Sequence, residues 1–126
     1  MDYKKWLDGH CPSKVVSAEK AIANIESGDR VFVGTGCGEP QHLIRAMVND
    51  QSIQDIMVYQ MLSSTFSQFV NDETFLKRFF LKLFFISRYM RKAAFDGKIE
   101  YIPAYLSQIP ILFAQRHIGL DVALIQ

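Results

Sequence analysis

The chain has 126 residues, of which 49% are apolar and 21% are charged, and its formal net charge is +1. This length and composition fit one globular domain with its own core. A net charge near zero excludes a general nucleic-acid binder, because neutralising phosphates requires a clear surplus of Lys and Arg. Two cysteines, Cys11 and Cys37, are too few for a disulfide framework and favour a cytoplasmic protein with reduced thiols.

The chain carries no obvious membrane segment. Its first residues are polar and lack the apolar stretch of a secretory signal. The most apolar stretch, residues 75–86, is interrupted by Lys77, Arg78 and Lys82, whereas a spanning helix needs about 20 consecutive apolar residues. We therefore expect a soluble protein.

In the first half of the chain, a helix is predicted over residues 18–27, with Ser17 as its amino-terminal cap and Gly28 as the residue that ends it. The apolar run at residues 30–33 predicts a buried strand. A second helix is expected to start at Pro40, whose missing N–H is not needed there. Its buried face should consist of Leu43, Ile44, Met47 and Val48, and residues 56–62 should form the next buried strand.

In the second half, the polar residues 63–74 predict a loop or a weak helix. The elements expected after them are a strand over 83–86, a helix over 89–95 closed by Gly97, an edge strand over 99–106 that contains Pro103, a helix from a cap at Ser107 to about His117 that Gly119 ends, and a strand over 122–125.

Alternating strands and helices predict an α/β fold, an open and mostly parallel sheet with helices on both faces. The sequence stops inside an apolar strand, although the ends of domains are usually polar. We therefore expect the sheet to be incomplete, and residues 1–126 to form a domain truncated before its natural end. An unpaired final strand is a template for pairing, which predicts self-association into a homo-oligomer.

The glycine turn, residues 34–40, reads Gly-Thr-Gly-Cys-Gly-Glu-Pro between a predicted strand and a predicted helix. Glycine lets the backbone take positive φ and lets a ligand approach its amides, and the helix N-terminus adds unpaired N–H groups. Such a turn suits a phosphate, a carboxylate or the oxyanion of an acyl intermediate. A tight turn with a packing role only is the alternative of equal weight.

Two well-known glycine-rich motifs do not fit the glycine turn. In a dinucleotide fingerprint the third glycine comes one residue later, and a carboxylate ends the next strand. A P-loop requires a lysine after its last glycine, and none follows Gly38.

Three blocks of sequence, in the same order, resemble the acetyl-CoA hydrolase/transferase family, which includes the 4-hydroxybutyrate CoA-transferases. The first joins residues 17–20, 28–34 and 36–40 with Leu43, the second comprises residues 84–86, 91–93, Gly97, 101–103 and 106–110, and the third is residues 120–126. The chain departs from the family at residues 87–90, where relatives carry glycine and asparagine or proline, and over residues 65–82. The resemblance implies an amino-terminal CoA-transferase-like domain.

The resemblance also implies a reaction: CoA passes between an acyl-CoA and a small carboxylic acid, or acyl-CoA is hydrolysed, through a glutamyl-CoA thioester. The CoA thioester is then the substrate, and no bound cofactor is implied. In the family the nucleophilic glutamate lies in the carboxy-terminal half, and no residue of this chain matches its motif. We therefore expect a missing carboxy-terminal domain as the partner, and no catalysis by the isolated chain.

The expected substrate- and CoA-binding residues are Gly36, Cys37, Gly38, Glu39 and Pro40, with the amides of residues 36–38 lining the acyl or CoA end of the cleft. Glu39 is expected to cap the helix at Pro40 rather than to act as a nucleophile. Cys37 lacks a His or Asp partner within its motif, which favours a small apolar filler over a nucleophilic thiol.

No metal site is predicted, because His42 and His117 have no second ligand at metal-site spacing.

The basic and aromatic segment 75–98 allows a second interpretation. As a single helix it would lie on a membrane or in a partner's groove, and the chain would be a non-catalytic remnant or an interaction module. We favour a buried strand followed by a solvated basic helix, because the family blocks place a strand–helix break near Ile86.

Overall fold

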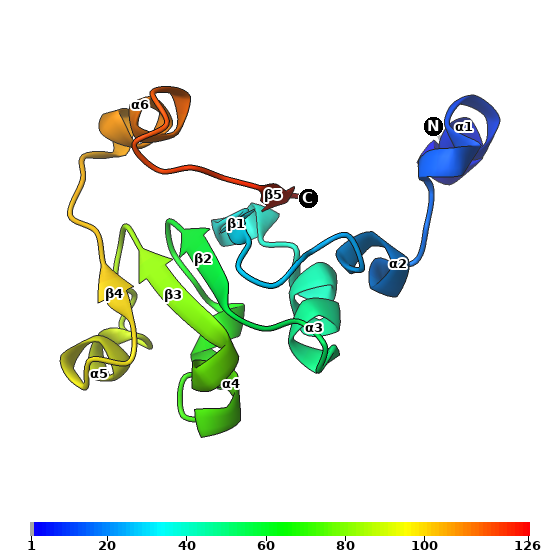
Figure 1. Cartoon of the computed structure of the whole chain (residues 1–126). Coiled ribbons are helices and arrows are strands. Elements are labelled where there is room, and N and C mark those ends of the chain that lie inside the picture. Colours follow the sequence, from blue (N-terminus) through cyan, green and yellow to red (C-terminus); the bar gives the residue numbers. More distant parts are fainter. Residues whose placement is uncertain (1) are drawn as a thin grey trace.

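The computed structural model describes residues 2–126. Its centre is a five-stranded sheet in the order β4-β3-β2-β1-β5, and all neighbouring strands are parallel (Figure 1). The strands are β1 (Arg30–Val33), β2 (Ile56–Gln60), β3 (Phe79–Leu83), β4 (Glu100–Tyr101) and β5 (Val122–Leu124). The predicted α/β class with an open parallel sheet is confirmed.

Helices pack on both faces of the sheet, as predicted (Figure 1). The first face buries apolar side chains of α2 (Ala18–Ile22), α3 (Gln41–Asn49), α4 (Glu73–Arg78) and α5 (Arg91–Phe95). The second face packs against α6 (Ile109–Ala114), whose Phe113 meets Phe32 of β1 and Tyr59 of β2 edge-on. The remaining helix, α1 (Tyr3–His10), has no buried residue and lies apart from the sheet.

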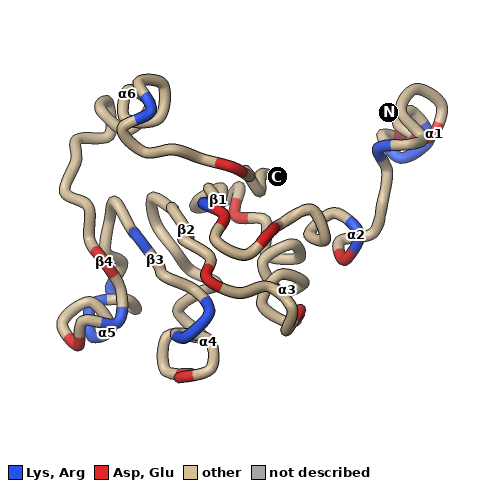
Figure 2. Tube along the Cα trace, viewed as in Figure 1, with Lys and Arg blue, Asp and Glu red and all other residues tan. Residues whose placement is uncertain are grey.

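Successive side chains of each strand point to opposite faces of the sheet, and residues paired across neighbouring strands point to the same face. Val31 lies beside Val58, and Val58 lies beside Leu81, and all three are at most 1% exposed in the core of the first face. Charged residues are spread along the trace and stand mostly on helices and at strand ends (Figure 2). No helix within residues 2–126 is long and apolar enough to cross a membrane.

Several element boundaries differ from the prediction. Helix α2 keeps its Ser17 cap, whose Oγ accepts from the Lys20 N–H at 3.2 Å, but it ends at Ile22. The chain then turns so that Ile25 enters the core, and Gly28, with φ of 91°, leads into β1. The predicted edge strand shrinks to Glu100–Tyr101. Ser107 lies inside a short 3-10 helix, Leu106–Gln108, and does not cap α6.

Segment 75–98 is not one helix, so the interpretation as a membrane-bound or groove-bound helix is wrong. It contains the end of α4, then β3, and then α5 after a bend. Strand β3 begins four residues before the strand predicted over 83–86, because Phe79, Leu81 and Leu83 alternate into the core against β2. The predicted break near Ile86 and the helix closed by Gly97, whose φ is 70°, are confirmed.

The strand order creates a switch point. Strands β1 to β4 follow one another in one direction across the sheet, whereas β5 returns to the other side of β1. The helix that follows β1, α3, and the helix that precedes β5, α6, pack on opposite faces of the sheet. Ligands of open α/β sheets bind beyond the carboxyl ends of strands at such a point.

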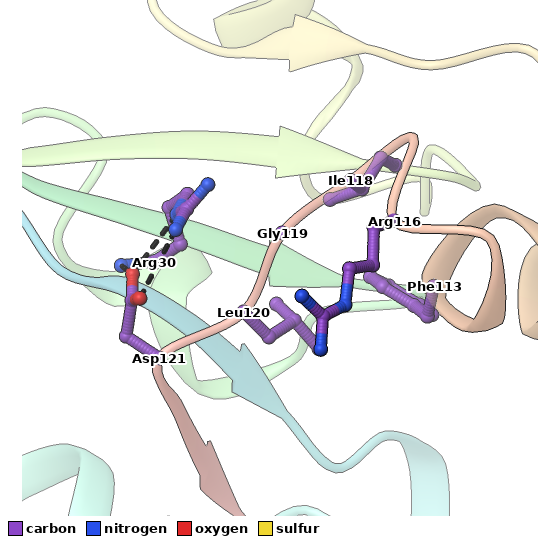
Figure 3. A pocket seen from close by; sticks show the side chains of 7 residues that line it. All are labelled: Arg30, Phe113, Arg116, Ile118, Gly119, Leu120 and Asp121. Carbon is purple, nitrogen blue, oxygen red and sulfur yellow. Dashed lines mark hydrogen bonds and ion pairs between the residues drawn. The ribbon is translucent and has the colours of Figure 1, made fainter.

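At the amino ends of the same two strands, Arg30 and Asp121 hold β1 against β5. The Arg30 backbone N–H and Nε both donate to Asp121 Oδ2 at 2.9 Å, and Nη2 donates to Oδ1 at 3.0 Å (Figure 3). The Asp121 N–H returns a bond to the Arg30 carbonyl at 3.0 Å. This pair fixes the register in which Val31 lies beside Val122.

The Arg30–Asp121 pair predicts an acid-dependent loss of stability. Hydrogen bonds from the Arg30 side chain, and then from its backbone N–H, lower the pKa of Asp121 from 3.8 to about 2. A depressed folded-state pKa stabilises the fold above about pH 4, and this contribution disappears as the pH falls towards 2. In urea unfolding, the stability advantage of the wild type over Asp121→Asn should therefore be present at pH 5 and shrink by pH 2. A stability difference between the two proteins that does not change with pH would contradict this prediction.

Candidate functional site

The glycine turn lies at the switch point, at the carboxyl end of β1 and beside the end of β5. The Gly34 N–H donates to the Leu124 carbonyl at 2.8 Å, so the turn starts directly from the β1–β5 pairing. It folds back on itself so closely that a Cβ at Gly34 would stand 2.6 Å from the Gly38 carbonyl oxygen. The structure thus brings the predicted binding residues to the edge where ligands of such sheets bind.

The turn leaves two of its amides unpaired. Residues 36–38 form a single 3-10 turn, which Gly36 enters with φ of 61°, a conformation that favours glycine. The Gly38 N–H is used inside the turn, where it donates to the Thr35 carbonyl at 3.1 Å. The N–H groups of Gly36 and Cys37 have no acceptor among residues 2–126, and both residues are exposed. Two of the three predicted amides are therefore free to meet a ligand.

The other predicted residues around the turn take varied positions. Cys37 is exposed, so the prediction that it is a small apolar filler is wrong: the turn leaves it at the surface. Pro40 is buried and stands at the N-cap, so that α3 begins one residue later, at Gln41. His42 and His117 lie on the surface, and residues 2–126 hold no group of three or more His, Cys, Asp or Glu that could bind a metal ion.

The Glu39 side chain is 4% exposed and does not cap α3, contrary to the prediction. It turns beneath the glycine turn towards the end of β2, where four donors converge on its carboxylate. Oε1 accepts from Gln60 Nε2 at 2.9 Å and from the Ser64 N–H at 3.1 Å. Oε2 accepts from the Thr65 N–H at 3.1 Å and from the Thr65 hydroxyl at 2.7 Å. These donors hold the side chain away from the helix N-terminus.

Gln60 is a residue of the site that sequence reasoning missed. It is fully buried, and its Nε2 donates both to Glu39 and to the Gly34 carbonyl at 2.8 Å, so it joins the two ends of the turn. Both neighbours are acceptors, which fixes the nitrogen there and leaves Gln60 Oε1 without a partner in residues 2–126. A glutamine at the end of an otherwise apolar strand is the signal that could have found it.

Thr35 anchors the turn from a third direction. Its hydroxyl donates to the Leu62 carbonyl at 2.7 Å and accepts from the Leu62 N–H at 2.9 Å. With Glu39 and Gln60 it ties the turn to the segment after β2. Because donors that are held in place need no reorganisation when charge develops nearby, this support suits the free amides of Gly36 and Cys37 to stabilise an oxyanion.

Comparisons with known proteins agree with the fold and with the predicted family. The acetyl-CoA hydrolase/transferase N-terminal domain model matches residues 3–126. A 4-hydroxybutyrate coenzyme A transferase of Clostridium kluyveri is 31% identical over 114 residues, which are 90% of this chain and 26% of that protein. A succinyl-CoA:acetate/propanoyl-CoA:succinate CoA transferase of Fasciola hepatica is 28% identical over 122 residues, which are 94% of this chain and 25% of that protein.

Solved structures share the fold at lower identity. RipA from Yersinia pestis superposes with a TM-score of 0.77 at 24% identity, over 99% of this chain and 30% of that one. A 4-hydroxybutyrate CoA-transferase from Porphyromonas gingivalis gives a TM-score of 0.59 at 20% identity, over 95% of this chain and 26% of that one. The chain thus spans about a quarter of the length of the curated relatives. It belongs to the acetyl-CoA hydrolase/transferase family and matches the amino-terminal domain of that family.

Proposed function

We propose that the chain is the amino-terminal part of an enzyme that transfers CoA between an acyl-CoA and a small carboxylic acid, or hydrolyses acyl-CoA, and that its glycine turn binds the thioester end of the substrate. The observation that carries this proposal is the pair of unpaired amides, Gly36 N–H and Cys37 N–H, at the switch point. The names of the two curated relatives support CoA transfer as the type of reaction.

The proposed chemistry assigns this chain a stabilising role. A glutamate from outside residues 1–126 attacks the thioester carbonyl. The CoA thiolate departs as the leaving group, and an acyl-glutamyl anhydride is formed. The thiolate then attacks the glutamyl carbonyl and releases the acyl group as a carboxylate, which leaves a glutamyl-CoA thioester. Each attack places negative charge on a carbonyl oxygen, and the amides of Gly36 and Cys37 would donate to that oxygen.

Glu39 is poorly placed to be the nucleophile of this chain. Both of its oxygens accept hydrogen bonds from groups beneath the turn, and the residue is almost fully buried. An attacking carboxylate needs an oxygen that faces the substrate. We therefore place the nucleophile in a carboxy-terminal domain that completes the enzyme, and expect no turnover by the 126-residue chain alone.

This proposal predicts how the glycine turn responds to mutation. The assay combines the chain with the carboxy-terminal domain of a 4-hydroxybutyrate CoA-transferase and measures CoA transfer to acetate. Gly36→Ala should lower kcat/KM by about tenfold or more, because a side chain at positive φ costs roughly 1–2 kcal/mol and the turn relaxes from the geometry that presents its amides.

Gly97→Ala is the matched control, since Gly97 also has positive φ and open space around its Cβ position but lies in the loop before β4. It should lower stability to a similar degree and leave kcat/KM unchanged. Equal activity losses in the two variants would refute the role of the turn. A chain that folds but never restores activity with the added domain would favour the non-catalytic remnant instead.

A further inference from the structure

A hollow lies at the amino ends of β1 and β5, at the end of these strands opposite the glycine turn, and we call it the amino-edge hollow. It encloses about 500 Å³, and Figure 3 shows its walls. One wall is Arg30 at the start of β1, another is formed by Phe113 of α6 and Arg116 just after that helix, and the third is the loop from Ile118 to Asp121. Pockets for small organic ligands fall in roughly this range of volumes.

The side chains that line the amino-edge hollow carry more positive than negative charge. They include two guanidinium groups, of Arg30 and Arg116, and one carboxylate, that of Asp121, while Asp29 acts on Arg30 from outside the lining. Asp121 accepts hydrogen bonds from Nε and Nη2 of Arg30, so the N–H groups of Nη1 remain available to a ligand. The Arg116 side chain extends beside Leu120 (Figure 3), and its guanidinium has no hydrogen-bond or ion-pair partner within residues 2–126. The guanidinium of Arg116 is therefore the charge of the lining that no carboxylate of residues 2–126 pairs with.

Backbone features shape the hollow next to both arginines. Arg116 has φ of 56°, which is uncommon for a residue with a side chain. The N–H of Arg116 donates to the Phe113 carbonyl at 3.0 Å, and the N–H of Ile118 donates to the Leu112 carbonyl at 3.1 Å, so this turn is held on both sides. Gly119 leaves room for Arg30, because a Cβ there would stand 2.2 Å from Nη1. These bonds hold the backbone of the hollow in place, while the Arg116 side chain is exposed.

The remaining side chains of the lining are apolar, although most of its exposed surface is polar. Phe113 and Ile118 are partly buried in the second-face core, and Leu120 is exposed beside Arg116. An inorganic ion would leave this apolar surface in contact with water. An organic anion with a short hydrocarbon chain would instead cover it, which is favourable in proportion to the apolar area removed from water.

We propose that the amino-edge hollow binds a small organic carboxylate. The carboxylate accepts from the Arg116 guanidinium, whose planar fork matches two oxygens, and from Nη1 of Arg30. The hydrocarbon chain lies against Phe113, Ile118 and Leu120. A single negative charge matches the unpaired guanidinium of Arg116, and it meets less repulsion from Asp121 than a doubly charged phosphate would.

The test is a nuclear magnetic resonance titration of the 126-residue chain with butyrate, followed through its backbone amides. We expect saturable shifts at residues 116 and 118–120 and none at residues 36–38. Butyramide, which has the same shape without the charge, should cause no such shifts. Arg116→Gln should weaken butyrate binding by at least about tenfold, and Arg45→Gln, which removes an equal charge from the exposed surface of α3, should not change it.

Several outcomes would overturn the proposal: equal binding of butyramide, equal weakening by the two arginine variants, or shifts that rise without saturation. Tighter binding of inorganic phosphate than of butyrate at the same amides would also reject the carboxylate. The comparison of butyrate with butyramide uses the wild-type chain, so it tests whether binding requires the negative charge even if Arg116→Gln does not fold. Gly36→Ala should leave butyrate binding unchanged, which separates a failure here from a failure of the proposed function.

Discussion

Replacing Glu39 by Gln is expected to lower the free energy of unfolding by about 3 kcal/mol, although the two side chains have the same shape. Each carboxylate oxygen faces a backbone donor: the Ser64 N–H on the Oε1 side and the Thr65 N–H on the Oε2 side. On the Oε1 side the new NH2 group would confront the Ser64 N–H, and on the Oε2 side it would leave the buried Thr65 N–H with only its longer bond of 3.3 Å to Oε1. That loss costs about 1–3 kcal/mol, and the surviving bonds also lose their charge assistance.

Gln60 cannot relieve this conflict by turning over. If its amide flipped to accept from residue 39, its Oε1 would face the Gly34 carbonyl, and a contact between two acceptors would replace the present hydrogen bond. The network is therefore built for a carboxylate at position 39.

Urea or thermal unfolding checks the Glu39 prediction, with a fall in Tm on the order of 10 °C expected for a domain of this size. Glu26→Gln is the matched control, because Glu26 is exposed, and it should change stability by less than about 0.5 kcal/mol. A Glu39→Gln variant as stable as this control would show that the buried carboxylate contributes nothing to the turn.

Replacing Arg78 by Lys is the second large effect, an expected loss of about 2–4 kcal/mol even though the charge is kept. Arg78 is 5% exposed, and no carboxylate pairs with it among residues 2–126. Its Nε donates to the Ile53 carbonyl and its Nη1 to the Val48 carbonyl, each at 3.0 Å, while Nη2 reaches the Asp50 carbonyl. These carbonyls belong to the end of α3 and the turn that follows it.

The geometry explains why lysine should fail. The last carbonyls of a helix have no partner within the helix, and they form the negative end of its dipole. The planar fork of Arg78 serves three carbonyls in different directions, whereas a single ammonium group on a different stem cannot reach all of them. At least one carbonyl would then lie buried and unpaired.

Chemical unfolding measures this effect, and Arg91→Lys on the exposed side of α5 is the control, with an expected change within about 0.5 kcal/mol. If both variants unfolded at the same urea concentration, Arg78 would be a surface cation, as in the single-helix interpretation of segment 75–98. A selective loss in Arg78→Lys would instead confirm that α4 delivers this residue into the interior.

Neighbouring residues were enough to predict the structure wherever a short stretch of chain determines its own conformation. The Ser17 cap, the strand at Arg30–Val33 and the positive φ of Gly97 could all be read from neighbouring residues. The stretch from Phe75 to Ile86 could not, because its apolar and basic residues fit a helical period and a strand period about equally. Pairing of Phe79 and Leu81 with β2 decides the matter, and that partner is more than 20 residues away.

The sequence by itself determined the α/β class, the glycine turn between a strand and a helix, and the resemblance to a family of CoA enzymes. Only the tertiary structure decided that β5 returns beside β1, that the carboxylate of Glu39 turns under the glycine turn to Gln60, and that two amides of the turn stay free. The reason is physical: Glu39 and Gln60 are 21 residues apart, and Arg30 and Asp121 are 91 apart. Such contacts exist only after the sheet has assembled, and no local preference along the chain encodes them.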